Sequence, residues 1–245
     1  VYATAPESCF NFNSSLGAIQ GYYTHQNNNP ANPACPIDFT TPATIGGVGV
    51  REINNNVGPY NHGIRNVVLA EGVTAITGNG FSVASSLQSV YIPSTVTSIE
   101  GGGFCSTKLV SAYVPASVSS FTGCGFGGIT TLKSLSIGMD STEESAPLDF
   151  GNYCGIIPST GHLNYLGIGS NVTALCNAGW NMSGHVVFQD GGKELTLRSM
   201  SFSDATLDSL TLPNRLKEIK GASFSGAKIK KLTIKEGTVP LTIDW

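Results

Sequence analysis

Apolar residues recur through most of the chain in one phrase, apolar-x-x-apolar-x-apolar, which begins again every 22 or 23 residues. Counted from Ile64, the phrase opens at residues 87, 109, 132, 163, 185, 207 and 229, so the steps are 23, 22, 23, 31, 22, 22 and 22 residues. One step carries an insertion. We number positions from the opening residue of each phrase, which is offset zero. Such a regular interval predicts a repeat protein in which each unit stacks on its neighbours.

Several columns of the repeat keep one chemical character. Offsets three and five are aliphatic with few exceptions, and offset six is mostly Pro or Gly, which ends a strand. Offsets nine and twelve are again apolar, while offset seventeen is aromatic and follows a Gly or Ser. The aromatic column holds Phe81, Phe104, Phe126, Trp180, Phe202 and Phe224, with Phe150 interpreted as the same residue displaced by one.

A coil of this length cannot enclose a core alone, because each buried apolar side chain needs a neighbour above and below it. Short β-branched segments that stack at about 4.8 Å build a parallel sheet along one side of the stack. The sequence therefore predicts a β-rich right-handed solenoid with one parallel strand per coil.

Two stretches carry a resemblance to a known family. Leu87-Gln-Ser-Val-Tyr-Ile-Pro-Ser-Thr-Val-Thr-Ser-Ile99 with Gly103-Phe104, and Leu207-Asp-Ser-Leu-Thr-Leu-Pro to Ile219 with Ser223-Phe224, resemble BspA-like leucine-rich repeats. The Ala that often precedes the Phe in that class is Gly or Ser here, and the Cys that often follows is mostly missing. The coils opening at 132 and 185 are degenerate. The resemblance implies a secreted or cell-surface protein that acts in adhesion or protein interaction.

The ends of the chain depart from the repeat. Residues 1–34 predict an N-terminal β-hairpin cap, and residues 35–63 a degenerate first repeat with Ile37 and Phe39 in its strand and Val50 and Ile53 at offsets nine and twelve. Residues 64–245 form the repeat solenoid, with an insertion at about 138–162. The last coil leaves three apolar residues either to close it or to meet another molecule, unless the chain is truncated there. These residues are Leu241, Ile243 and Trp245.

Charge narrows the range of partners. Only 12% of the residues are charged, the net charge is −3, and no basic run is present to neutralise phosphates, so we expect neither nucleic-acid nor membrane-surface binding. No apolar run approaches the roughly 20 residues of a membrane span. The chain begins at Val1 without a Met or a signal peptide, which we expect of a mature exported protein.

Six cysteines are present and none forms a Cys-x-x-Cys pair, which removes the main support for zinc or thioredoxin-like sites. Disulfides are favoured over buried thiols, and they indicate an oxidising compartment, extracellular or at the cell surface. From spacing, we expect the pairs Cys9–Cys35, Cys105–Cys124 and Cys154–Cys176.

Candidate chemistry is sparse, so we expect no enzyme and no cofactor. The four histidines are scattered, and His185 with Asp190 is better explained by a one-residue slip that turns both side chains to solvent. Carboxylates in the insertion offer a weak Ca²⁺ alternative to a solvated acidic loop. They are Asp140, Glu143, Glu144 and Asp149. Asn13, Asn171 and Asn181 begin N-glycosylation acceptor patterns.

Strand side chains at offsets two and four face outward and form an extended ladder. Tyrosines there are good anchors for a partner, because they bury much area at low entropic cost, although simple packing along the ladder is an equal alternative. The candidate ligand-binding residues are Tyr91, Tyr113, Tyr165, Ser89 and Ser111. The leading hypothesis is a binding module for an extracellular protein or glycan. The alternative is a subunit that assembles with copies of itself, end to end, into a filament or surface layer.

Overall fold

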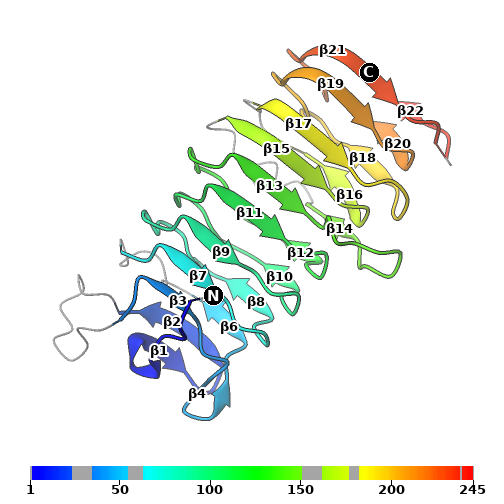
Figure 1. Ribbon diagram of the computed structural model, residues 1–245. Helices are drawn as coiled ribbons and strands as arrows, with labels where there is room; N and C mark the ends of the chain where they lie inside the picture. Colours follow the sequence, from blue (N-terminus) through cyan, green and yellow to red (C-terminus); the bar gives the residue numbers. More distant parts are fainter. Residues whose placement is uncertain are drawn as a thin grey trace.

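The computed structural model describes residues 2–23, 35–54, 63–150, 162–176, 182–237 and 239–244, and these form a β-solenoid whose coils stack along one axis (Figure 1). The predicted repeat architecture is therefore confirmed. Within the described ranges the only helical element is the 3-10 turn η1 (Glu7–Cys9), and no helix there could cross a membrane.

The phrase that opens each coil forms a strand, which pairs in parallel with the equivalent strand of at least one neighbouring coil. Val67 pairs with Val90, and Leu135 with Leu166, so the offset-three residues lie directly above one another. These strands make three short sheets along one side, ordered β3-β7-β9, β11-β13-β15-β17 and β19-β21. The strands are β3 (Asp38–Thr40), β7 (Asn66–Val68), β9 (Ser89–Tyr91), β11 (Ser111–Val114), β13 (Ser134–Ile137), β15 (Leu163–Ile168), β17 (Met182–Phe188), β19 (Thr206–Leu212) and β21 (Lys228–Ile234).

Most coils add a second strand near offset twelve, so the expectation of one strand per coil was too simple. When similar coils stack, a second extended segment also lies above its counterpart, and Ile76, Ile99 and Phe121 pair in this way. These strands form two sheets, β1-β2-β6-β8-β10-β12 and β14-β16-β18-β20-β22. Their bounds are β6 (Glu52–Asn54), β8 (Ala75–Thr77), β10 (Ser98–Ile99), β12 (Ser120–Phe121), β14 (Leu148–Asp149), β16 (Val172–Leu175), β18 (Leu195–Leu197), β20 (Leu216–Ile219) and β22 (Thr242–Ile243).

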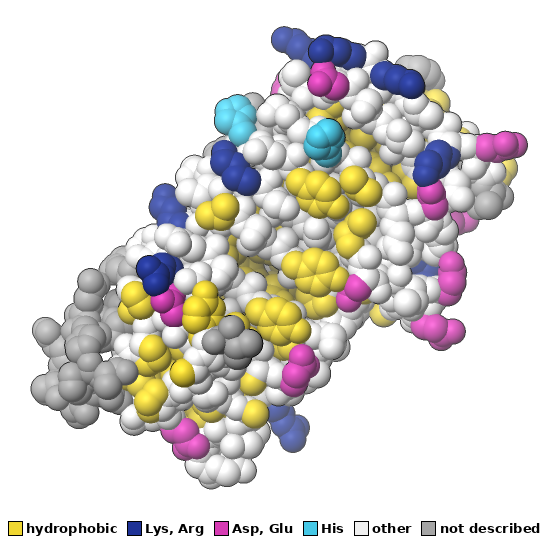
Figure 2. Space-filling view, in the orientation of Figure 1, with side chains coloured by type: hydrophobic (Ala, Val, Ile, Leu, Met, Phe, Trp, Pro, Cys, Tyr) yellow, Lys and Arg dark blue, Asp and Glu magenta, His cyan; other side chains and the backbone are white. Residues whose placement is uncertain are grey.

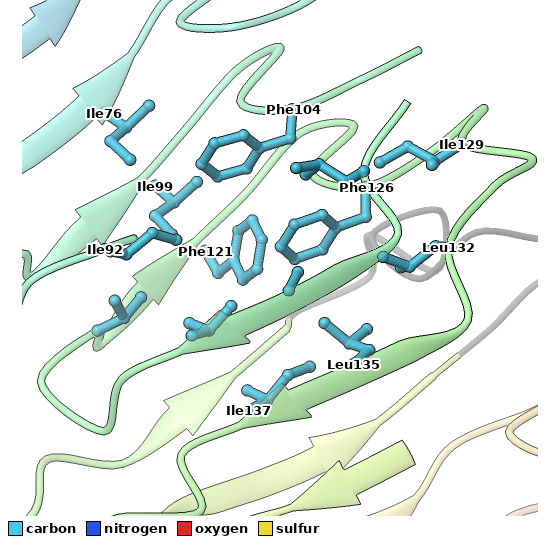
Figure 3. Close-up of a cluster of buried hydrophobic side chains, with 14 of the residues drawn as sticks. Ile76, Ile92, Ile99, Phe104, Phe121, Phe126, Ile129, Leu132, Leu135 and Ile137 are labelled. Carbon is cyan, nitrogen blue, oxygen red and sulfur yellow. The ribbon is translucent and has the colours of Figure 1, made fainter. Parts of the chain in front are cut away.

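The apolar columns meet inside the coils as one continuous core, part of which is shown in Figure 3. Phe104 stacks between Phe81 and Phe126, with ring centroids 5.6 and 5.4 Å away, and all three rings are fully buried. Phe104 and Phe126 thus each cover the ring of the coil before them, as the aromatic column predicted.

Two details of the repeat differ from the expectation. In β17, Val186 and Phe188 pair with Leu166 and Ile168, so this coil begins two residues earlier than the regular spacing indicated. His185 then holds offset two and is exposed, as expected for its side chain. Phe150 packs edge-on against Phe121 of offset twelve, at 6.0 Å, and follows directly on β14. It therefore belongs to the second-strand column rather than to the aromatic column.

The N-terminal end is covered on both sides of the solenoid. The antiparallel hairpin of β1 (Phe10–Asn13) and β2 (Ala18–Tyr22) extends the second-strand sheet, because β2 pairs in parallel with β6. On the other side, Thr4 bridges Thr40 of β3. A smaller hairpin joins β4 (Thr44–Ile45) to β5 (Val48–Gly49).

The degenerate first coil follows the repeat with one correction. Phe39 pairs with Val67 and is fully buried, so it takes offset three, while Ile37 lies before the strand and is 43% exposed. Ile53 pairs with Ile76, as its assignment to offset twelve predicted.

Disulfides Cys9–Cys35 and Cys105–Cys124 are formed, with Cα–Cα distances of 5.7 and 5.9 Å, which confirms two of the expected pairs. Cys176 is disulfide-bonded as well. Its expected partner, Cys154, lies outside the described residues. The first bond ties the hairpin cap to the first coil, and the second joins two neighbouring corners.

Candidate binding face

Outward side chains of the opening strands form two rows, one at offset two and one at offset four, and we call this surface the strand face. Strand pairing sets the order within each row. Figure 2 shows hydrophobic side chains gathered along the middle of the molecule on this side. The first row is Asp38, Asn66, Ser89, Ser111, Ser134, Tyr165 and His185, and the second is Thr40, Val68, Tyr91, Tyr113, Ser136, Gly167 and Val187.

Tyr91 and Tyr113 lie on neighbouring coils and are 53% and 41% exposed. The hydroxyl of Tyr113 donates a hydrogen bond to the Asp140 carboxylate, and desolvation of the hydroxyl together with this bond raises the pKa of Tyr113 above its ordinary value. Asp140 is itself fixed, because its Oδ1 accepts a bond from the Ala116 amide at 2.8 Å. The ring of Tyr113 is therefore anchored at one end while its face remains accessible.

Tyr165 lies two coils beyond Tyr113, and it is partly exposed. Its hydroxyl occupies space that only a glycine leaves free: a Cβ on Gly167 would stand 3.1 Å from Tyr165 Oη and 2.9 Å from Met139 Cγ. Gly167 thus allows the tyrosine to lie along the strand face beside Met139. We call Tyr91, Tyr113 and Tyr165 the tyrosine strip.

A hydrogen-bond network orders the first row at the N-terminal end of the strand face. Arg65 donates from Nε and Nη2 to the two oxygens of Asp38, at 3.1 and 2.5 Å, and Asn66 donates to the same carboxylate at 2.7 Å. The Arg65 guanidinium holds the pKa of Asp38 below its usual value. Ser89 continues the chain with a bond of 2.6 Å to Asn66 Oδ1. The positive charge of Arg65 and the negative charge of Asp38 therefore cancel within the network.

A polar column at offset eight holds successive coils together, and the sequence analysis missed it. Each side chain in this column bonds to the backbone of an earlier coil. The bonds are Thr95 Oγ1 to Val73 O (2.7 Å), Ser117 Oγ to Val96 O (2.7 Å), Ala116 N to Asp140 Oδ1 (2.8 Å) and Asn171 Nδ2 to Ala146 O (3.2 Å). The available signal was the absence of apolar residues from a column that lies next to the core. Asn171 is 1% exposed, so it is inaccessible as a glycosylation acceptor.

Arg215 ends this column as a buried cation. Its guanidinium donates to four carbonyl oxygens, and burial lowers its pKa to about 10, which leaves it charged at neutral pH. The acceptors are Gln189 O (2.9 Å), Val172 O (2.6 Å), Lys193 O (2.9 Å) and Gly169 O (2.8 Å). One side chain therefore joins three consecutive coils.

The acidic residues of the insertion serve different partners. Glu143 accepts a bond from the Gly192 amide at 3.2 Å, and Asp149 pairs with Arg198 at 2.7 Å, while Asp140 holds Tyr113. Glu144 is exposed. Within the described ranges no three His, Cys, Asp or Glu side chains come close enough to hold a metal ion.

At the C-terminal end, Leu241 is partly buried and Ile243 is 44% exposed, whereas Trp245 lies outside the described residues. His162 and His185 are exposed on the solenoid surface, and His25 and His62 fall in ranges that the structure does not describe. The residues that the structure brings together are thus those of the strand face.

Comparisons with known proteins agree with this architecture. No curated protein matches the chain. A solved structure of a leucine rich cell surface protein from Faecalibacterium prausnitzii is 12% identical over 92% of each chain, with a TM-score of 0.30. Six copies of a family model described as BspA type leucine rich repeat region match residues 51–177 and 188–242, more than half of the chain, and the protein therefore belongs to the BspA-type leucine-rich-repeat family.

Proposed function

We propose that this protein is a secreted or cell-surface binding module that holds an extracellular protein or glycan on its strand face. The observation that carries the proposal is the pair Tyr91 and Tyr113, two large, half-exposed rings on neighbouring coils, of which Tyr113 is anchored by Asp140. Rigid tyrosines flanked by small hydroxyl side chains provide contact area at low entropic cost.

Two further features support this function. The disulfides suit an oxidising compartment outside the cytoplasm. The strand face is rigid as well, since its side chains stand on strands whose inward neighbours are mostly buried, with Val90 and Val186 partly buried.

The test uses the double variant Tyr91→Ala/Tyr113→Ala against Leu16→Ala, which removes an equally exposed side chain from the distant hairpin turn (55% exposed). The full chain is immobilised and screened by biolayer interferometry against extracellular proteins and glycans. We expect every genuine ligand to bind at least about tenfold more weakly to the double variant. An unchanged melting temperature excludes misfolding, and ligands that bind both variants equally would remove the strand face from consideration.

End-to-end assembly is the second candidate, and it rests on the apolar side chains exposed at the last coil, namely Leu232, Ile234 and Ile243. A head-to-tail contact would meet the covered N-terminal end of the next copy, which weakens this candidate. Size-exclusion chromatography with light scattering decides between them. We expect a monomer of 25.5 kDa, and regular filaments would favour assembly instead.

A further inference from the structure

We infer that the ligand of the tyrosine strip is an uncharged polysaccharide that lies along the solenoid axis. This inference rests on the proposed binding function and names the chemical class that the strand face fits best. It draws on three properties of the surface, namely its charge, its mixture of rings and hydroxyls, and its spacing.

The first property is the absence of free charge along the two rows between β7 and β15. The outward residues there are Asn, Val, Ser, Tyr and Gly. The two carboxylates at the border are occupied, because Asp38 is neutralised by Arg65 and Asp140 accepts bonds from Tyr113 and from the Ala116 amide. A charged partner would leave part of its charge desolvated and unpaired on this surface, which is costly. An uncharged ligand meets no such penalty.

The second property is the contrast in height between the two rows. Ser89, Ser111 and Ser134 are small, so the rings of Tyr91 and Tyr113 stand beside a lower shelf lined with hydroxyls. A pyranose ring presents an apolar C–H face and a hydroxyl edge. The aromatic ring packs against the C–H face, which its negative π face attracts. The Ser111 and Ser134 hydroxyls can donate to and accept from the sugar hydroxyls, whereas Ser89 can only accept, because it donates its proton to Asn66.

The third property is the repeat distance. Successive coils are about 4.8 Å apart, the spacing of paired strands. An extended chain of pyranose units advances by a similar length per unit, so a polysaccharide along the axis offers one sugar to each coil. A peptide advances only about 3.1 to 3.4 Å per residue and falls out of step with the coils.

Preorganisation strengthens the fit. The hydrogen bond to Asp140 fixes Tyr113, and Gly167 leaves room for the Tyr165 hydroxyl beside it. Binding therefore does not have to immobilise these two side chains. A larger side chain at position 167 displaces the Tyr165 hydroxyl, which gives a variant that alters the strip without removing a tyrosine.

The experiment is affinity gel electrophoresis of the full chain in gels that contain one soluble polysaccharide each. The neutral probes are a mixed-linkage β-glucan, a xyloglucan and a glucomannan, and the anionic probes are polygalacturonate and heparin. We expect at least one neutral probe to retard the protein. The apparent Kd should rise at least about tenfold in Tyr91→Ala/Tyr113→Ala, rise less in Gly167→Val, and stay unchanged in Leu16→Ala. Circular dichroism checks that all variants fold.

Three outcomes would overturn the inference: no retardation by any neutral probe, retardation that the double variant retains, or a preference for anionic probes that salt abolishes. The same variants are then tested against extracellular proteins and proline-rich peptides. A protein or peptide ligand that requires the tyrosines would refute the polysaccharide and leave the binding function intact. If neither class of ligand depends on Tyr91 and Tyr113, both proposals fail.

Discussion

The coils near the two ends of the solenoid build the same core with different polar residues. The N-terminal coils are residues 64–131, and the C-terminal coils are residues 183–234. Both place a column of stacked phenylalanines inside the corner, and the ring separations are nearly equal, 5.6 Å for Phe81–Phe104 and 5.5 Å for Phe202–Phe224. The apolar columns therefore fix the geometry of the coil, whatever surrounds them.

The corners before these rings differ. In the N-terminal coils, Gly101 and Gly103 adopt positive φ angles of 66° and 34°. In the C-terminal coils a non-glycine residue, Ala222 at φ 61°, takes the left-handed position, and the following Ser223 is buried with its hydroxyl donating to the Lys220 carbonyl at 2.5 Å. The glycines of the N-terminal corner adopt positive φ angles without strain. The C-terminal corner tolerates the strain at Ala222 and gains the hydrogen bond of Ser223.

Polar cross-links also change along the chain. In two of the N-terminal coils a hydroxyl at offset eight, from Thr95 or Ser117, bonds to one carbonyl. Arg215 alone bonds to four carbonyls in the C-terminal region. Among the residues that the structure describes, five of the six ion pairs involve residues beyond 185, and Asp38–Arg65 is the one pair in the first coils. The stack therefore needs an apolar column and satisfied backbone groups, and different polar residues satisfy the backbone at its two ends.

The largest expected effect separates the middle of the aromatic column from its end. Phe104→Ala removes a ring stacked on both sides and should lower the free energy of unfolding by about 3 to 5 kcal/mol. Phe224→Ala removes a partly exposed ring whose stacking partner is Phe202, and should cost only about 1 to 2 kcal/mol. Urea unfolding followed by circular dichroism measures both. Equal losses would show that the last coil is covered as well as the middle ones.

The next effect concerns the offset-eight column. Arg215→Met fills the same space but leaves four buried carbonyls without their donor, and we expect a loss of about 2 to 4 kcal/mol. Thr95→Val removes the bond to the Val73 carbonyl and should cost about 1 kcal/mol. The same urea titration compares the two. A loss for Arg215→Met no greater than that for Thr95→Val would contradict the role given to the guanidinium.

How well the sequence predicted the molecule depends on the kind of residue. The columns of Leu87, Val96 and Phe104 predicted the coil length, the core and the stacking, because apolar residues recur only where a neighbouring coil covers them. The coil containing Gly184 and His185 misled the alignment, since its polar residues interrupt the period and only strand pairing shows the true register.

The anchors of the candidate binding face were harder to predict. Tyr91 and Tyr113 were found from the outward offset, and their exposure agrees. Their binding role stays a prediction. Asp140 was expected to belong to a solvated acidic loop, with calcium binding as a weak alternative. Its bond to Tyr113 was missed because the two residues are 27 positions apart and the repeat does not specify the path of the corner between them. The burial of Arg215 was also missed, because an arginine gives no hydrophobic signal in the sequence. The polar character of offset eight in other coils was the only indication.

The two corner designs predict stability changes of opposite sign. Gly101→Ala places a side chain at positive φ and against the Gly78 carbonyl, so we expect a loss of about 2 kcal/mol. Ala222→Gly removes a left-handed alanine from an exposed corner and should raise stability by about 0.5 kcal/mol, since relief of strain outweighs the added chain entropy. Thermal unfolding of both variants measures the difference. Destabilisation by Ala222→Gly would show that the C-terminal corner is unstrained.

The smallest expected effect compares one ion pair from each end under acid. Hydrogen bonds from Arg65 to Asp38 and from Lys235 to Asp190 lower the pKa values of both carboxyls in the folded protein. Each pair therefore contributes stability above the unfolded Asp pKa of about 3.9, and this contribution is lost as the pH falls through the lower folded value. Asp38→Asn and Asp190→Asn should each flatten the fall in melting temperature between pH 5 and pH 3, by about 1 to 3 °C.

Each carboxylate accepts bonds from two residues, Asp38 from Arg65 and Asn66, and Asp190 from Lys235 and the Asn214 amide. The Asp38 variant should show the larger flattening, because the Asp38 side chain is 22% exposed and that of Asp190 is 39% exposed. Salt at about 0.5 M shortens the screening length and should shrink the Asp190 effect more than the Asp38 effect. Melting curves at the two pH values, with and without salt, supply the four comparisons. If Asp190→Asn flattened the curve more, the abundance of ion pairs in the C-terminal coils would outweigh the better geometry of the single N-terminal pair.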